Sequence, residues 1–279
     1  MPELPEVETV RRSLEAAVRG EVLRGVEVRD RGFRHPVPTR GLEALVGARL
    51  AELRRRGKVL LLDFVRNGGA EPRTVLVHLG MSGRMLVGAP DAPWQTHEHV
   101  RFFVGERLVR FVDPRRFGSV ELTATAVVES HDRVARLGPE PLGDGFDGEY
   151  LFRITRGRRV AIRSFLLDGH NVAGVGNIYA NEACFRAGIR PGRAAGRLSR
   201  AEAERLANAV KRVLERAIRD GGSTLSDGGY TDAEGNAGGF QTRMAVYDRA
   251  GEPCRRCAAP IRHRLVGQRS AYFCPVCQR

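Results

Sequence analysis

The feature that most constrains this chain is a pattern of four cysteines near its C-terminus. The spacing is C-x2-C-x16-C-x2-C, made by Cys254, Cys257, Cys274 and Cys277. Two close pairs of thiolates suit a closed tetrahedral zinc site that leaves no coordination position open for catalysis. The pattern therefore predicts one structural Zn²⁺ ion per chain, held in a small folded module.

The segment between the two cysteine pairs is expected to form a β-hairpin that turns near Gly267, as in a zinc ribbon or zinc finger. It carries Arg262, Arg264 and Arg269, which would present basic side chains to a polyanion. The fifth cysteine, Cys184, lies in an apolar helical stretch and is interpreted as a core residue.

Charge indicates the same class of partner. The 279 residues include 46 Lys and Arg against 33 Asp and Glu, a net charge of +13. Such a surplus is typical of proteins that bind nucleic acid, although a merely soluble basic protein is the plainer alternative. Only Lys58 and Lys211 are lysines. A lysine kept in so arginine-rich a chain favours proton-transfer chemistry at Lys58, unless it is only a charge at a strand edge.

The first half of the chain is expected to be one helix followed by β-structure. Val7, Val10, Leu14 and Val18 recur at helical spacing after Pro5. Short β-rich runs separated by turn residues predict a sandwich or barrel. The clearest of these runs are 59–64, 74–79, 99–104 and 107–112.

The second half is expected to be helical. A Gly- and Pro-rich linker covers 137–145, and a long amphipathic helix follows Ser199, which forms a capping box with Glu202 and precedes a stop at Gly221. The Gly-rich stretch 226–239 is expected to be a flexible loop.

Neither a signal peptide nor a membrane span is expected. Glu3 and Glu6 stand where a basic signal segment would be, and the longest apolar runs, such as 59–65, are too short to cross a bilayer. We therefore expect a cytoplasmic protein, in which disulfides are rare.

Two loop motifs suggest contacts with a nucleic-acid duplex. In DPRRFG, Arg115 could probe an orphaned base while Phe117 wedges into the base stack, and in HLGMSG, Met81 could be a second wedge. The ordinary alternatives are a basic turn with a packed Phe and a Met in the core.

A third motif, GVGNIYANE, combines a Gly-rich turn with the start of a helix. Backbone N–H groups at a helix start can bind phosphate, and Asn177 could add a side-chain contact. A dinucleotide-binding fingerprint is absent, because Ala180 occupies the third glycine position. We therefore expect no nucleotide cofactor.

Taken together, MPELPEVE, HLGMSG, DPRRFG, GVGNIYANE and QRSAYFCPVCQ resemble the bacterial formamidopyrimidine-DNA glycosylases over the whole chain. The resemblance implies an α+β multidomain fold with an N-terminal β-sandwich, a helical domain with a helix–two-turn–helix element, and a β-hairpin zinc finger. The corresponding boundaries are 1–130 for the sandwich, 131–147 for a linker, 148–241 for the helical domain with a lesion-contacting loop at 224–241, and 242–279 for the zinc finger.

The resemblance also implies a reaction on damaged double-stranded DNA by a monomer. Oxidised purines such as 8-oxoguanine and formamidopyrimidines would be excised through an iminium at Pro2, and the strand would then be cut by β- and δ-elimination. Pro2 is implied as the nucleophile, exposed after Met1 is removed, and Glu3 as its acid/base partner. Lys58 is implied in the first elimination and Arg269 in the second, with Glu6 ordering the terminus.

Further residues match the family's DNA contacts. Met81, Arg115 and Phe117 match the triad that fills the gap left by the flipped base. The matches to phosphate contacts are His97, Arg158 and Asn177. The loop 226–239 matches the family at its flanks but little in its interior, which leaves lesion preference the least determined feature.

Three alternatives remain at this level. An endonuclease VIII-like glycosylase would remove oxidised pyrimidines, although such enzymes usually open MPEGPE, whereas Leu4 stands here. A DNA-damage binding protein would lack catalysis, and a zinc-ribbon transcription accessory protein would not explain the first ten residues.

Overall fold

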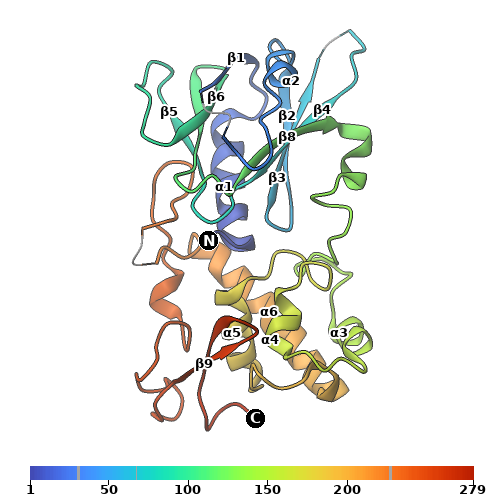
Figure 1. Cartoon of the computed structure of the whole chain (residues 1–279), viewed down its shortest axis with the longest axis vertical. Helices are drawn as coiled ribbons and strands as arrows, with labels where there is room; N and C mark the ends of the chain where they lie inside the picture. The colour runs from blue at the N-terminus through green and yellow to red at the C-terminus, as the bar shows by residue number, and fades with distance from the viewer. Residues whose placement is uncertain (30–31, 67, 226–227) are drawn as a thin grey trace. The chain divides into compact units, whose positions relative to one another are not determined.

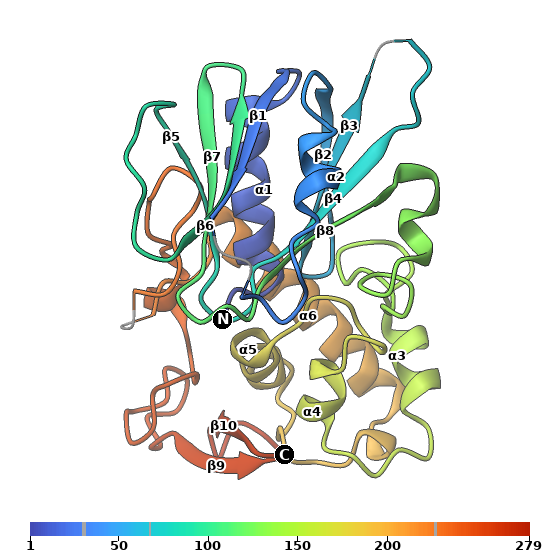
Figure 2. The same ribbon diagram turned by 45° about the horizontal axis from the view of Figure 1, so that its top comes forward.

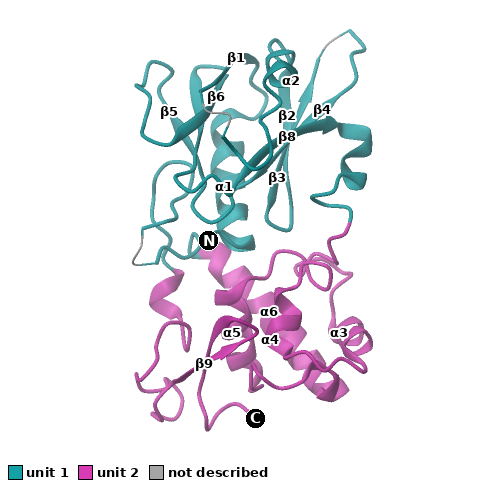
Figure 3. Cartoon of the chain, viewed as in Figure 1, with its two compact units in different colours: residues 1–135, 220–239 teal, residues 136–219, 240–279 magenta. Residues whose placement is uncertain are grey.

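The computed structural model describes all residues except 30–31, 67 and 226–227. The chain forms two compact units (Figure 3): unit 1 is 1–135 with 220–239, and unit 2 is 136–219 with 240–279. The sequence assigns 224–241 to the helical domain, whereas the structure groups 220–239 with unit 1. The physical reason is that Tyr230 and Ala233 are buried in the core of unit 1.

Unit 1 is a β-sandwich, as expected (Figures 1 and 2). Its described strands form two antiparallel four-stranded sheets, ordered β1-β6-β7-β5 and β2-β3-β4-β8. The strands are β1 (Leu23–Val28), β2 (Arg49–Arg56), β3 (Val59–Val65), β4 (Arg73–His78), β5 (Arg84–Gly88), β6 (Glu98–Val104), β7 (Arg107–Val112) and β8 (Ser119–Ala124).

Helix α1 (Leu4–Val18) packs against both sheets through β2, β3 and β5. Val7, Val10, Leu14 and Val18 are buried, which confirms the apolar stripe expected from the sequence. The described part of the first 135 residues has two further short helices, α2 (Thr39–Glu43) and the 3₁₀ helix η1 (Thr125–Ser130).

Unit 2 is mainly helical. The helices are α3 (Gly148–Thr155), α4 (Ile162–Leu167), α5 (Asn177–Ala187), η2 (Ala195–Arg197), α6 (Arg200–Arg219) and η3 (Phe240–Arg243). The predicted capping box of α6 is confirmed, because the N–H of Ser199 donates to Glu202 at 2.8 Å and the N–H of Glu202 donates to the Ser199 hydroxyl at 3.2 Å. Within the described residues, no helix is both long and apolar enough to cross a membrane.

A two-stranded hairpin ends unit 2, as the cysteine spacing predicts. Strands β9 (Arg262–Val266) and β10 (Arg269–Phe273) pair antiparallel, with Gly267 and Gln268 between them. Both turn residues have positive φ, 52° and 60°, the combination that a type I′ hairpin turn requires. The N–H of Tyr272 donates to the side chain of Asn181 at 2.8 Å and so attaches the hairpin to α5.

Candidate active site

The N-terminus is fixed by a capping box of two acidic residues. Glu3 is the N-cap of α1, and its backbone N–H donates to the Glu6 carboxylate at 2.8 Å, while the Glu3 side chain accepts from the N–H of Glu6. Both residues are only 2 % exposed. Pro2 is buried immediately before this cap. The residue that carries the implied nucleophile therefore precedes a rigid helix start rather than a free tail.

The segment 220–239 is attached to the same helix start. The N–H of Ser223 donates to the other oxygen of Glu6 at 2.8 Å. The buried Tyr230 hydroxyl donates to the carbonyl of Gly221 at 3.1 Å and lies 3.4 Å from that of Glu6, and burial raises the pKa of Tyr230. The expected flexible loop at 226–239 is thus anchored in its described part. Its residues 226–227 lie outside the described ones.

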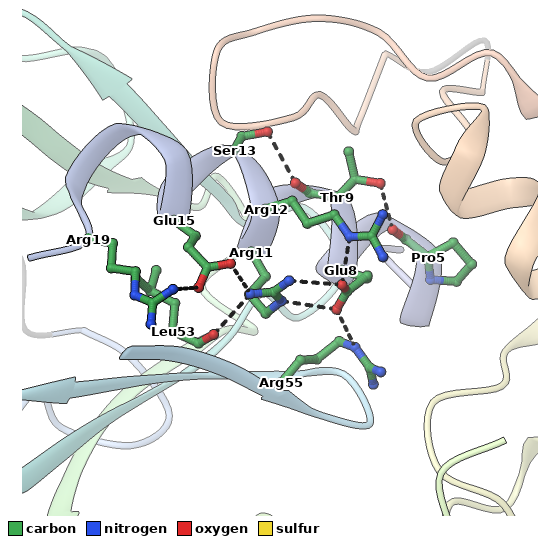
Figure 4. A network of polar contacts seen from close by, with 10 residues as sticks. All are labelled: Pro5, Glu8, Thr9, Arg11, Arg12, Ser13, Glu15, Arg19, Leu53 and Arg55. Carbon is green, nitrogen blue, oxygen red and sulfur yellow. Dashed lines mark hydrogen bonds and ion pairs between the residues drawn. The ribbon is translucent and has the colours of Figure 1, made fainter. Parts of the chain in front are cut away.

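Lys58 lies in the turn between β2 and β3 and is half-buried. Arg55 links this turn to α1, because its Nε donates to the Glu8 carboxylate at 3.1 Å (Figure 4). A terminal nitrogen of Arg55 also donates to the carbonyl of Gly57 at 2.9 Å. The turn that carries the implied lysine is therefore connected to the helix that begins after Pro2.

Glu8 is the centre of this ionic network. Its carboxylate also accepts from Arg11 at 3.1 Å and from Arg12 at 2.8 Å. Burial alone would raise the pKa of Glu8, but the hydrogen bonds and charges of the surrounding arginines hold it below its usual value. Glu8 therefore stays ionised and keeps Arg55 in place.

The implied wedge residues lie at exposed loop tips. Met81 is 41 % exposed and Phe117 is 57 % exposed, which is unusual for large apolar side chains. The guanidinium of Arg115 lies over the Phe117 ring, 4.8 Å from its centroid. This exposure excludes the alternative in which Met81 and Phe117 are core residues and leaves both available for contacts outside the chain.

His97 is exposed in the loop before β6 and adopts a left-handed backbone with φ of 63°. Its carbonyl accepts the backbone N–H of Asp113 at 2.9 Å. A backbone hydrogen bond thus joins His97, the implied phosphate-binding residue, to Asp113, the first residue of the DPRRFG motif.

In unit 2, Arg269 and Arg158 are both exposed. Arg269 is the first residue of β10, directly after the hairpin turn. Arg158 lines a surface hollow together with Arg153, Arg156 and His170. Both side chains are accessible to a polyanion.

Asn177, at the start of α5, has its side chain engaged within unit 2. It accepts from Arg163 at 2.5 Å and donates to the carbonyl of Ser270 at 3.1 Å. Arg163 is 0 % exposed, also donates to the carbonyl of Val266, and has its pKa lowered by burial. Sequence reasoning missed Arg163, which connects α4, α5 and the hairpin that carries Arg269.

The four cysteines fit zinc. All four Sγ atoms lie within 4.8 Å of one another. The Sγ–Sγ distances are 3.9 Å for Cys254–Cys277 and 3.4 Å for Cys257–Cys274, close to the roughly 3.8 Å that tetrahedral Zn–S bonds of about 2.3 Å require. Backbone N–H groups also point at two of the sulfurs, as a thiolate needs. The chain therefore has one structural zinc site.

Cys184 is separate from this cluster. It is fully buried in α5, and burial raises its thiol pKa to about 12. Its interpretation as a core residue is confirmed.

The structure divides the implied site residues between its two units. Unit 1 contains Pro2, Glu3, Glu6, Lys58, Met81, His97, Arg115 and Phe117, and unit 2 contains Arg158, Asn177, Arg269 and the four cysteines. Within unit 1, α1 is connected both to the 220–239 segment and to the Lys58 turn.

Three family models match the chain in order. The N-terminal domain of formamidopyrimidine-DNA glycosylase matches 1–120, the helix–two-turn–helix domain of the same proteins matches 137–228, and a zinc finger found in these proteins and in isoleucyl-tRNA synthetases matches 251–279.

Whole proteins match as well. Formamidopyrimidine-DNA glycosylases from Thioalkalivibrio sulfidiphilus and Halorhodospira halophila are 48% and 50% identical to the chain, each with complete coverage of both sequences. The crystal structure of MutM (FPG) from Thermus thermophilus is 42% identical with a TM-score of 0.87, over 99% of this chain and 98% of that one. A complex of the Lactococcus lactis protein with DNA containing an abasic site is 33% identical with a TM-score of 0.89, over all of both chains.

Proposed function

The chain belongs to the formamidopyrimidine-DNA glycosylase family, and from this premise we propose how its own residues carry out the reaction. It is a base-excision repair enzyme, a bifunctional DNA glycosylase and abasic-site lyase. Its substrates are oxidised purines in duplex DNA, 8-oxoguanine and formamidopyrimidines. A solved relative binds DNA that contains a formamidopyrimidine lesion.

The nucleophile is the amine of Pro2 after removal of Met1. The observation that carries this assignment is the helix start directly behind it, where Glu3 and Glu6 form a buried capping box. An α-amino group has a reference pKa of about 7.7–8.0, against about 10.4 for lysine, so more of it is unprotonated near neutral pH. A secondary amine also forms an iminium that has no N–H proton left to lose, so the iminium stays cationic.

The reaction then needs proton transfers at fixed positions. The Pro2 nitrogen attacks C1′ and loses its proton, while the electron pair of the glycosidic bond leaves with the base, which takes up a proton. The C1′–O4′ bond of the sugar then opens, O4′ takes up a proton, and the nitrogen lone pair forms the iminium at C1′. The resulting iminium acidifies C2′–H, whose loss expels the 3′ phosphate, and a second elimination expels the 5′ phosphate. Glu3 serves as the acid/base partner, Lys58 acts in the first elimination and Arg269 in the second.

The lesion base must leave the stack before this chemistry, at a cost of a few kcal/mol. Met81 and Phe117, exposed at two loop tips, fill the vacated space together with Arg115. The proposed phosphate contacts are His97, Arg158 and Asn177. The side-chain amide of Asn177 is already hydrogen-bonded within unit 2. Its phosphate contact would therefore come from the backbone N–H of Asn177 at the start of α5.

We assign the functional segments by the boundaries predicted from the sequence: residues 224–241 form the lesion-contacting loop, and residues 242–279 form the zinc finger. Cys254, Cys257, Cys274 and Cys277 bind the zinc, whose role is structural. The site of action is the bacterial cytosol, on the nucleoid.

A paired-substrate assay tests this function. Duplexes carrying one 8-oxoguanine opposite cytosine or one thymine glycol opposite adenine are incubated with enzyme in excess. Faster release of 8-oxoguanine supports the proposal, and faster release of thymine glycol would move the chain to the endonuclease VIII-like class. Tight binding to both duplexes without release of either base would indicate a damage-binding protein.

A further inference from the structure

The carboxylate of Asp113 joins two loops that are far apart in sequence. It is 0 % exposed. One oxygen accepts the hydroxyl of Ser82 at 2.6 Å and the N–H of Arg115 at 3.3 Å, and the other accepts the N–H of Gly118 at 2.8 Å. Ser82 directly follows Met81, so one buried group connects the loop of one wedge residue with the loop of the other.

The backbone of Asp113 joins a third loop. Its N–H donates to the carbonyl of His97 at 2.9 Å, and its own carbonyl lies 3.0 Å from the ring nitrogen Nε2 of His99. His97 and Arg116 both have left-handed backbones, with φ of 63° and 55°. Such conformations cost about 1–3 kcal/mol in a non-glycine residue and persist only where neighbouring contacts enforce them.

The two wedge loops also pack closely against each other. A Cβ atom added to Gly80 would lie 2.5 Å from backbone atoms of Phe117 and Gly118, and one added to Gly118 would lie 2.7 Å from the carbonyl oxygen of His78. The two wedge loops thus touch backbone to backbone, with no side chain between them to absorb a shift.

We propose that Asp113 is a positioning residue that holds the loops 78–83, 95–98 and 113–118 as one body, so that Met81, Arg115 and Phe117 enter the DNA together. Asp113 itself touches no DNA. The proposal rests on the proposed function, because it concerns the step in which the damaged base leaves the stack. It assigns to a buried carboxylate the coordination of that step rather than any bond chemistry.

The test compares Asp113→Asn with Asp63→Asn. Asp63 is also a buried carboxylate of unit 1, held by Arg54 and Thr74, but it lies in β3 outside the three loops. In each variant the new amide cannot accept every N–H or O–H donor that the carboxylate accepted, so the two lose a comparable number of hydrogen bonds. Ser82→Ala and Ser82→Thr form a second pair that removes or keeps the hydroxyl at smaller cost to folding.

Three readouts are taken from each variant. They are the fluorescence of 2-aminopurine beside the lesion, which reports unstacking, the single-turnover release of 8-oxoguanine, and the cleavage of a preformed abasic site. Asp113→Asn and Ser82→Ala should slow unstacking and base release by roughly tenfold to hundredfold while abasic-site cleavage changes by less. Asp63→Asn and Ser82→Thr should leave the ratio of base release to abasic-site cleavage near that of the unmodified enzyme.

Amide hydrogen exchange of the DNA-free protein gives a readout that does not depend on activity. Asp113→Asn should speed exchange in all three loops at once. Faster exchange confined to 113–118, or an equal loss of base release and abasic-site cleavage, would overturn the proposal. If the unmodified enzyme releases no base from any lesion, the proposed function is overturned. The hydrogen-exchange result then still shows whether Asp113 couples the three loops.

Discussion

Glu6 and Ser223, which are 217 positions apart, are joined by a hydrogen bond of 2.8 Å from the Ser223 N–H to the Glu6 carboxylate. The same carboxylate accepts the N–H of Glu3. A single buried side chain therefore connects the residue beside the proposed nucleophile with the base of the proposed lesion loop.

Glu6→Gln should slow release of the damaged base more than it slows cleavage of an abasic site. A glutamine can accept only one of the two N–H groups, and its own NH₂ then faces the other donor. Losing a hydrogen bond to a charged group costs about 1.5–3 kcal/mol, so release of 8-oxoguanine should slow roughly tenfold to hundredfold, with a smaller loss in cleavage of a preformed abasic site. Single-turnover assays on both substrates measure this.

Glu15→Gln on the same helix is the control. Its carboxylate pairs with the side chains of Arg11 and Arg19 rather than with the terminus or the loop. An equal change of both rates in Glu6→Gln, or an effect of the same size in Glu15→Gln, would contradict a specific connection between loop and terminus.

The elements predicted correctly from sequence have strong local signals. The cysteine spacing, the capping box of α6 and the apolar runs of β3, β4, β6 and β7 all lie within short windows. Strand β2 lies within the predicted β-structure but not among its clearest runs, because LRRRGK resembles an exposed basic run, although Leu50 and Leu53 are buried in the core. A register shift in the pairing of β2 with β3, between Leu50 and Glu52, also interrupts the period of two.

The candidate residues were predicted from motifs, but the groups that hold them were not. Arg55, Asp113, Arg163 and Tyr230 act through partners dozens to hundreds of positions away, and no local pattern reveals such pairs. The segment 226–239 was expected to be flexible because it is rich in Gly and polar residues, whereas Ala233 is fully buried and its carbonyl accepts the N–H of Val87. Composition alone does not predict that anchor.

Acid should destabilise unit 1 through His78. Its Nδ1 accepts the N–H of Gly80 at 3.1 Å, which requires a neutral ring. Burial, with the nearby charges of Arg133 and Lys58, lowers the pKa of His78 from 6.5 to about 4. The unfolded chain therefore binds this proton first, and the free energy of unfolding should fall by about 3 kcal/mol as the pH drops from 6.5 to 4.

Urea unfolding at pH 7 and pH 4.5 checks this for the unmodified protein and for His78→Asn. The asparagine oxygen can accept the same N–H without titrating in this range. The variant should lose less stability between the two pH values, whereas a parallel loss would remove His78 as the cause.

Zinc should be required for the C-terminal hairpin. Cys254→Ser should abolish stoichiometric zinc, lower the melting temperature of the hairpin and weaken DNA binding, because a serine oxygen does not replace the thiolate. Cys184→Ala, which removes the buried cysteine outside the cluster, should retain one zinc per chain. Metal analysis with a binding titration decides this, and normal affinity without zinc would argue against the structural site.

DNA affinity should fall steeply with salt. Each neutralised phosphate contributes a slope of about −0.9 in log K against log salt concentration, so several contacts should cost roughly a hundredfold or more in affinity between 50 and 200 mM salt. Replacing Arg262 and Arg264, both exposed on β9, should flatten the slope. Arg24→Ala, whose residue is paired with Glu106 in unit 1, should not. A flat dependence would exclude a phosphate-dominated interface.

The most direct test of the central proposal is borohydride trapping on a duplex with one 8-oxoguanine opposite cytosine. The iminium should be reduced to a stable adduct that peptide mapping assigns to an N-terminal Pro2. Pro2→Gly should bind the same DNA while its adduct and strand cleavage fall severely, and Pro5→Ala, three positions along in α1, should still be trapped. An adduct that maps to another residue, or unchanged cleavage by Pro2→Gly, would contradict Pro2 as the nucleophile.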